Sequence, residues 1–239
     1  MAAAPRPAPR RERARAATIE EIKHTALDLM RTSGSLEIRF TDIARVMELT
    51  PPALYRYFAD RDALLNELIA DAYTSLGSIV AAARDAVPPD DVWGRFLAIA
   101  EAYRRWARSE PHLFTLILGQ PVAGYVAPED GPTTEAAQRA MRELSLVFVD
   151  AHRQGALGEP LLRDTHPELV AHKKEKHPEA AEVPAANFLA MLHFWASMHG
   201  FTSLEAYGHF AWLEPETRDE MFVRQVKLAA MAAGIKVPD

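Results

Sequence analysis

The chain has 239 residues, of which 49% are hydrophobic, and a formal net charge of −6. This length provides one large domain or two modest ones, and the apolar share is enough to bury a sizeable core. The absence of cysteine excludes disulfides and thiolate metal sites and favours a reducing, cytoplasmic location. No signal peptide and no apolar run of about 18 residues is visible, so we expect no membrane partner.

Charge is distributed unevenly along the chain. Residues 1–18 contain five arginines and one glutamate, whereas residues 63–239 contain 16 Lys and Arg against 24 Asp and Glu. A basic end on an acidic body concentrates positive potential at one end of the molecule. We expect residues 1–17 to form a disordered basic arm, either simply solvated or weakly attracted to DNA phosphates.

The first predicted helix begins near Thr18 and stops at Gly34. Thr18 and Glu21 match the capping box of a helix start, and glycine is a common terminator. Apolar residues recur at helical spacing between these limits, so this helix would brace the segment that follows.

Residues 40–61 are predicted to form two short helices separated by a tight turn. Thr41 and Thr50 carry hydroxyls that can cap a helix start, and Pro51 suits the first position of the second helix. Leu54 and Phe58 lie one turn apart and would anchor that helix to a core. The residues left facing partly outward are Pro52, Ala53, Tyr55, Arg56 and Tyr57. This pattern is typical of a helix-turn-helix unit that enters the DNA major groove.

Three stretches here resemble the N-terminal domain of the tetracycline-repressor (TetR) family: Ile-Ala (43–44), Leu-Tyr-Arg-Tyr-Phe (54–58) and Arg-Asp-Ala-Leu-Leu (61–65). The resemblance covers roughly residues 18–70. It implies an all-helical homodimer that a ligand releases from DNA. The chain departs from the family pattern in the turn, where Glu48 and Leu49 replace a frequent glycine, and at Arg61, where lysine is usual.

The resemblance and the helix starts together assign roles to the DNA-binding residues. Thr41, Thr50, Tyr57 and Arg61 are expected mainly on phosphates, whereas Pro52, Ala53 and Tyr55 face the bases. The full predicted set is Arg39, Thr41, Thr50, Pro52, Ala53, Tyr55, Arg56, Tyr57 and Arg61.

The rest of the chain is predicted to be helical, with loops marked by proline and glycine. Asp60 would cap a long helix over 61–84, which joins the reading unit (residues 18–65) to a ligand-binding and dimerisation domain (66–239). Further helices are expected over 90–109, 112–118, from 133 to about 154, over 188–207 and over 215–233, with a polar connection at 156–182. The last two carry surplus apolar surface, so we expect a homodimer built from them.

Aromatic side chains in four of these helices predict a small-molecule cavity. Clustered rings with a few imidazoles suit an effector that is mostly apolar, whereas a fully filled core is the alternative. The predicted lining is Tyr103, Trp106, Phe114, Phe148, His152, Trp195 and His199. The Trp195-to-Gly200 stretch also resembles the Trp-x-x-x-His-Gly stretch of one TetR subgroup.

Other chemistry has little support in the sequence. His166, His172 and His177 are spaced by six and five residues, which differs from the four-residue spacing of helical zinc motifs, so we expect loop histidines and no metal site. No phosphate-binding glycine loop or nucleophile elbow is present, so we expect neither a cofactor nor an enzyme.

The sequence therefore predicts an all-α transcriptional regulator with an N-terminal helix-turn-helix domain and a larger helical domain. It would bind a palindromic operator as a dimer, act as a repressor, and respond to a small effector. The alternatives are a helical ligand-binding or assembly protein that binds no operator, and a helical enzyme. Selection of bound sequences from random duplex DNA separates them.

Overall fold

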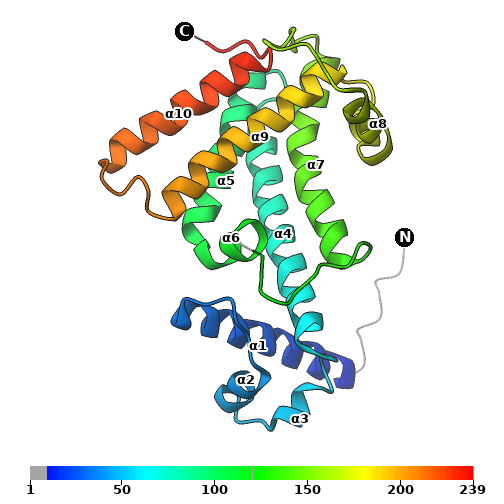
Figure 1. The fold of residues 1–239 in the computed structure, drawn as a ribbon, viewed down its shortest axis with the longest axis vertical. Coiled ribbons are helices and arrows are strands. Elements are labelled where there is room, and N and C mark those ends of the chain that lie inside the picture. The colour runs from blue at the N-terminus through cyan, green and yellow to red at the C-terminus, as the bar shows by residue number, and fades with distance from the viewer. Residues whose placement is uncertain (1–9, 120, 239) are drawn as a thin grey trace, which may run out of the picture.

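The computed structural model describes residues 10–119 and 121–238, and this part of the chain is all-helical, as predicted (Figure 1). Its α-helices are α1 (Arg10–Ser33), α2 (Phe40–Val46), α3 (Pro51–Leu54), α4 (Arg61–Asp85), α5 (Val92–Ser109), α6 (Pro111–Leu118), α7 (Pro132–Arg153), α8 (Pro167–Lys176), α9 (Ala185–Ala206) and α10 (Pro215–Ala232). A 3-10 turn, η1 (Pro178–Ala180), follows α8, and a single antiparallel bridge joins Leu157 to Ile235.

The helices surround two hydrophobic cores that share α4. Leu64, Leu65 and Leu68 of α4 pack into the core of the small N-terminal unit formed by α1 to α3, which we call the head. Leu76 and Val80, further along the same helix, pack into the core of the larger unit, which we call the body. A continuous helix through both cores makes α4 a rigid connection between them (Figure 1).

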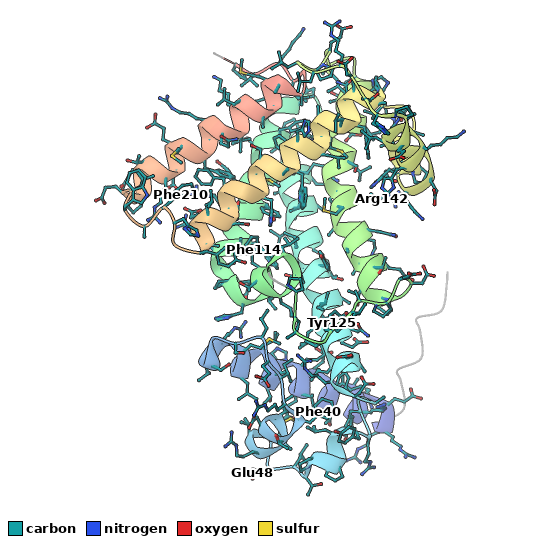
Figure 2. The ribbon with its side chains drawn as sticks, in the orientation of Figure 1. Phe40, Glu48, Phe114, Tyr125, Arg142 and Phe210 are labelled. Atoms are coloured by element: carbon teal, nitrogen blue, oxygen red, sulfur yellow. The ribbon has the colours of Figure 1, made fainter. Side chains whose placement is uncertain are left out.

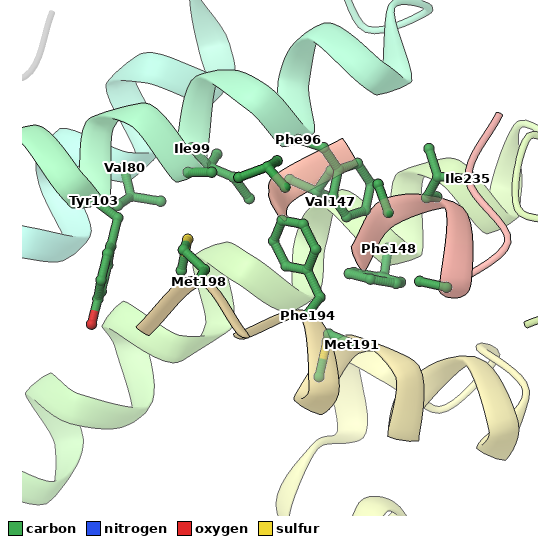
Figure 3. Packing of buried hydrophobic residues seen from close by; sticks show 14 of the residues in the cluster. Val80, Phe96, Ile99, Tyr103, Val147, Phe148, Met191, Phe194, Met198 and Ile235 are labelled. Atoms are coloured by element: carbon green, nitrogen blue, oxygen red, sulfur yellow. The ribbon is translucent and has the colours of Figure 1, made fainter. Parts of the chain in front are cut away.

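The body core is built around α5, which is buried along most of its length. Phe96 of α5 makes edge-on contacts with Phe148 of α7 and Phe194 of α9, at centroid separations of 4.7 and 5.2 Å (Figure 3). Edge-to-face geometry is the favourable arrangement for such rings. Helices α9 and α10 pack against this core from outside, at the end of the molecule remote from the head (Figure 1).

Local sequence signals explain most helix boundaries. The carboxylate of Asp60 accepts a hydrogen bond from the Ala63 N–H at 2.8 Å, and that of Asp91 accepts one from the Gly94 N–H at 2.8 Å. Proline occupies the first turn of α3, α6, α7, α8 and α10, where its missing N–H leaves no gap. The predicted limits of α4 to α7, α9 and α10 lie within a few residues of the observed ones.

The predicted starts of the first two helices, at Thr18 and Thr41, are wrong. Helix α1 begins at Arg10, so residues 10–17 of the predicted disordered arm are helical, whereas residues 1–9 lie outside the described part. Thr18 lies inside this helix, where its hydroxyl donates to the carbonyl of Ala14 at 3.1 Å. Thr41 is likewise inside α2, because Arg39 occupies the N-cap position. The Arg39 side chain makes no capping hydrogen bond. Thr50 does precede α3, also without a side-chain cap bond.

Candidate DNA interface and effector pocket

The α2–α3 pair is held by a tight turn in which Glu48 takes the conformation that usually requires glycine. Its φ is 55°, and the Leu49 N–H reaches back to the Ala44 carbonyl at 2.8 Å. A left-handed backbone costs a residue with a Cβ about 1–2 kcal/mol, which the head core must offset. Leu54 and Ile43, both completely buried, supply that anchorage. The turn therefore keeps helix-turn-helix geometry without its glycine.

Side chains on the outer surface of this pair are free to meet DNA. Pro52, Arg56 and Thr50 are exposed, and Tyr55 is 58% exposed although its ring lies 5.1 Å from that of Phe40. Figure 2 shows Phe40 and Glu48 at the end of the molecule away from the body. Of the remaining predicted residues, Thr41 and Arg39 are exposed, whereas Ala53 and Tyr57 are half-buried.

Arg61 differs from the other predicted DNA-binding residues because its guanidinium contacts the body. Its Nη1 donates to the carbonyl of Ala123, in the loop after α6, at 3.2 Å. Its Nε is buried and has no hydrogen-bond partner among the described residues. This bond uses only one of the five guanidinium N–H groups, so Arg61 joins the loop after α6 to the start of α4.

The first two turns of α1 place further positive charge beside α3, the second helix of the pair, which we call the recognition helix. The Arg15 guanidinium lies 5.5 Å from the centre of the Tyr57 ring and donates to the Arg56 carbonyl at 3.5 Å. Arg10, Arg11 and Arg13 precede it and are exposed. The sequence showed the charge but not its place, because the segment was expected to be disordered.

Four residues of the predicted effector site meet where α5, α6 and α9 converge. The hydroxyl of Tyr103 lies 2.7 Å from Nδ1 of His199. Trp195 stacks on the His199 ring, with centroids 5.4 Å apart and planes within 7°, and Phe114 lies 5.7 Å from it on another side. Tyr103 and Phe114 are also edge-on to each other at 6.2 Å.

The space beside this cluster is small. A cavity of about 30 Å³ is lined by Tyr103 and Trp195 together with Tyr73, Met141 and Met198, among others, and we call it the inner cavity. By the usual measure it holds a water molecule or two, far below the 300–1,000 Å³ of typical ligand sites. A second, open groove of about 770 Å³ shares Tyr73 and Met141 with it, and we call it the outer groove.

Comparisons with known proteins agree with this arrangement. Residues 96–229 match the family model described as Tetracyclin repressor-like, C-terminal domain. The chain is 33% identical over 204 residues to the HTH-type transcriptional regulator Rv1816 of Mycobacterium tuberculosis, covering 84% of this chain and 83% of that protein. The chain belongs to the TetR family of transcriptional regulators.

Solved structures of similar proteins support the same fold. The crystal structure of SCO4313, described as a regulatory protein, superposes with a TM-score of 0.71 at 33% identity, covering 93% of this chain and 98% of that one. The TetR family transcriptional regulator PfmR of Thermus thermophilus superposes with a TM-score of 0.52 at 17% identity, covering 87% and 96%. The helix-turn-helix unit of this TetR-family regulator is therefore a DNA-binding element, and the family is one of regulators and not of enzymes.

Three residues predicted to line the effector site of this TetR-family regulator lie elsewhere. Trp106 is buried, and its indole N–H donates to the Ser75 hydroxyl at 3.2 Å. Phe148 belongs to the Phe96 and Phe194 cluster. His152 is half-buried one turn beyond Phe148 and lines neither the inner cavity nor the outer groove.

In the described part of the chain, the histidines of the polar connection are not grouped as metal ligands would be. Residues 10–119 and 121–238 contain no group of three or more His, Cys, Asp or Glu suited to a metal ion. His166 caps α8, accepting from the Glu168 N–H at 3.3 Å, and His177 lies 5.1 Å from the Phe188 ring. Within the same described residues, no helix combines the length and apolar character that crossing a membrane requires.

The polar pair in the effector cluster is uncharged at neutral pH. Burial raises the pKa of Tyr103 above its ordinary value, and burial lowers the pKa of His199 below 6.5. A neutral imidazole has one donor and one acceptor nitrogen, so Nδ1, beside the Tyr103 hydroxyl, and Nε2, 3.3 Å from the Ser203 hydroxyl, take opposite roles. The cluster is therefore a neutral hydrogen-bonded chain from α5 to α9.

Acidification is expected to destabilise the fold through His199. A group whose folded pKa is depressed contributes stability that is present above the unfolded pKa, about 6.5, and is lost as pH falls through the folded pKa. We expect the unfolding free energy to fall more steeply below pH 6.5 in the wild type than in His199→Gln. Urea unfolding at several pH values and one protein concentration measures this. His209→Gln, at an exposed position, is the control and should keep the wild-type profile; parallel profiles for wild type and His199→Gln would contradict the assignment.

Proposed function

We propose that this TetR-family regulator is a repressor that binds a palindromic operator as a homodimer and is released by a small, mostly apolar effector. The observation that carries the proposal is the α2–α3 pair, whose anchoring residues Leu54 and Ile43 are completely buried while Pro52, Tyr55 and Arg56 stay exposed. A recognition helix needs both properties, a fixed orientation and a free outer face.

The contacts divide by position on the pair. Exposed Thr41 and Thr50 lie at or near helix starts, where backbone N–H groups also favour phosphate oxygens. Pro52, Ala53 and Tyr55 lie on α3 and its C-terminal end, from which base edges are contacted. Tyr57 and Arg39 border this surface, and Arg39 is held by Glu37 at 2.8 Å.

Selection of bound sequences from random duplex DNA tests operator binding. The expected result is a two-fold symmetric sequence whose half-sites lie about 34–36 Å apart or a small multiple of that spacing. Arg56→Gln should then weaken binding to the selected duplex, whereas Arg105→Gln, an exposed arginine of the body, should not. Failure to enrich any sequence would favour a helical ligand-binding or assembly protein instead. Placing the selected duplex before a reporter gene separates repression from activation.

The proposed dimer surface is the outer face of α9 and α10. Leu228 and Met231 of α10 are 63% and 55% exposed, and Leu161 beside them is 77% exposed. A shallow groove of about 330 Å³ runs between the two helices, and the position of a Cβ on Gly200 has no heavy atom within 4 Å. Exposed apolar residues next to open backbone suit close packing by a second copy of the same surface.

A charge on this face should separate the protomers. We expect Leu228→Glu to convert the dimer to a monomer in sedimentation at micromolar concentration, because a dimer would bury that charge unpaired. Val126→Glu is the matched control, since Val126 is 86% exposed in the loop before α7 and lies outside the surface. Wild-type protein that sediments as a monomer while binding a two-fold operator would contradict the proposed dimer.

The effector acts through the end of α6 and the loop that follows it, both of which contact α4. Tyr73 of α4 donates to the Ile117 carbonyl at 3.0 Å, and Tyr125 of the loop donates to the Asn66 side chain at 2.6 Å. With Arg61 bound to Ala123, these contacts tie the loop along α4. A ligand releases DNA only by preferring one arrangement, and tenfold release needs about 1.4 kcal/mol of preference.

A further inference from the structure

The outer groove is lined by both apolar and basic residues. The apolar ones include Ile69 and Tyr73 of α4, Ile117 of α6 and Met141 of α7. The basic ones are Arg139 and Arg142 of α7 and Lys176 at the end of α8. Figure 2 shows Arg142 between α7 and α8. A ligand that fills this groove meets both hydrocarbon and positive charge.

Two of these three basic residues are already paired. Arg139 lies 3.6 Å from Glu135, and Lys176 lies 2.8 Å from Glu175. Arg142 is exposed, and no carboxylate of the described residues lies within 4 Å of it. Its guanidinium can therefore take a carboxylate in the bidentate geometry that arginine favours, without first giving up a partner.

The inner cavity is the opposite in character. Its lining is apolar apart from the Tyr73 and Tyr103 hydroxyls and the indole N–H of Trp195, and none of the lining residues is charged at neutral pH. An anion has no counter-charge there, and transferring one into such surroundings is costly. Because Tyr73 and Met141 line both spaces, the outer groove adjoins the inner cavity, and a hydrocarbon chain that lies along these two residues extends toward it.

We propose that the effector is an amphipathic carboxylate, with its acid group on Arg142 and its hydrocarbon chain along Tyr73 and Met141 toward the inner cavity. This inference rests on the proposed function for its regulatory meaning, but the binding itself can be measured without DNA. Ile117 of α6 and Pro121, Val122 and Tyr125 of the following loop form part of the wall, so a chain lying in the groove displaces the loop residues that contact Asn66 and Arg61.

Calorimetric titration of the full chain with decanoate and 1-decanol tests the chemistry. We expect decanoate to bind at least tenfold more tightly than 1-decanol, and hexanoate to bind more weakly than decanoate because it buries fewer methylene groups. Arg142→Gln should weaken decanoate binding roughly five- to tenfold and leave 1-decanol unchanged. Arg105→Gln, an exposed arginine on α5 that does not line the groove, should change neither.

The outcomes that overturn the inference differ from those that overturn the proposed function. Equal affinity for decanoate and 1-decanol, or decanoate binding unaffected by Arg142→Gln in a folded variant, rejects the carboxylate site. If decanoate binds through Arg142 but leaves affinity for the selected duplex unchanged, the carboxylate site is confirmed. The proposal that its ligand releases the protein from DNA is then rejected. Release of the duplex by 1-decanol alone leaves the proposed function standing and rejects the inference.

Discussion

Replacing Arg104 with alanine is expected to lower the free energy of unfolding by about 3–5 kcal/mol. Arg104 lies on α5 and is 7% exposed, and its guanidinium donates to both carboxylate oxygens of Glu205 on α9 at 2.6 Å each. Its Nη1 lies 2.8 Å from Asp219 of α10. One side chain therefore joins three helices of the body, and its removal leaves the Glu205 carboxylate buried without a partner.

The surroundings of Arg104 explain why the cost should be large. The guanidinium lies over the Phe222 ring at 4.7 Å and near Phe201 at 5.6 Å, so it is shielded from water on its faces as well as its edge. The Glu205 side chain is only 5% exposed, whereas Asp219 is 61% exposed and can return to water. The penalty thus comes mainly from Glu205.

Urea unfolding at fixed protein concentration measures the loss, since dimerisation would otherwise change the apparent stability. Arg105→Ala is the control, because Arg105 follows directly on α5 and is exposed. The double variant Arg104→Met with Glu205→Leu should recover most of the stability, because it removes both charges and keeps the volume. A single variant as stable as Arg105→Ala would show that the pair contributes little.

Helix boundaries could be predicted closely where one residue decides them. Asp60 caps α4 with its own carboxylate, so the residue type that predicts the helix start also makes the capping bond. The start of α1 could not be found in this way. The Thr18 and Glu21 pair suggested a cap, but the Ala- and Arg-rich residues before it are themselves strong helix formers, and the helix continues back to Arg10.

The effector site could be predicted only in part, because its assembly depends on how helices are rotated against each other. Tyr103 and His199 meet since α5 and α9 pack with those faces inward. Phe148 is also an aromatic residue in a predicted helix, but it lies on a face of α7 that packs against Phe96. Arg142 gave no signal at all, since a single charged residue on a helix is ordinary until its neighbours are placed.

The basic first turns of α1 lead to the second large prediction, for DNA binding. Replacing Arg10, Arg11 and Arg13 with glutamine should reduce affinity for the selected duplex roughly tenfold to a hundredfold at physiological salt. These residues are exposed on the helix that brings Arg15 onto Tyr57, beside the recognition helix. Four arginines and one glutamate there also oppose the helix dipole, so the charge does not serve the stability of α1.

The salt dependence of binding distinguishes phosphate binding from a general loss of folding. For every phosphate that the variant no longer neutralises, the slope of log affinity against log salt should become shallower by about 0.9. The preferred sequence should not change, because we propose that α3, and not α1, contacts the bases. Helix α1 should be kept or slightly strengthened, which circular dichroism and urea unfolding can verify.

A charge-matched control separates local contacts from the net charge of the molecule. Arg105, Arg153 and Arg163 are exposed on the body, and their joint replacement by glutamine removes the same charge far from the recognition helix. If the α1 arginines lie on phosphates, only their replacement changes the salt slope, and the body variant follows the wild type. Equal shifts in the two triple variants would mean that long-range attraction alone explains the effect, and α1 would then have no direct part in the DNA interface.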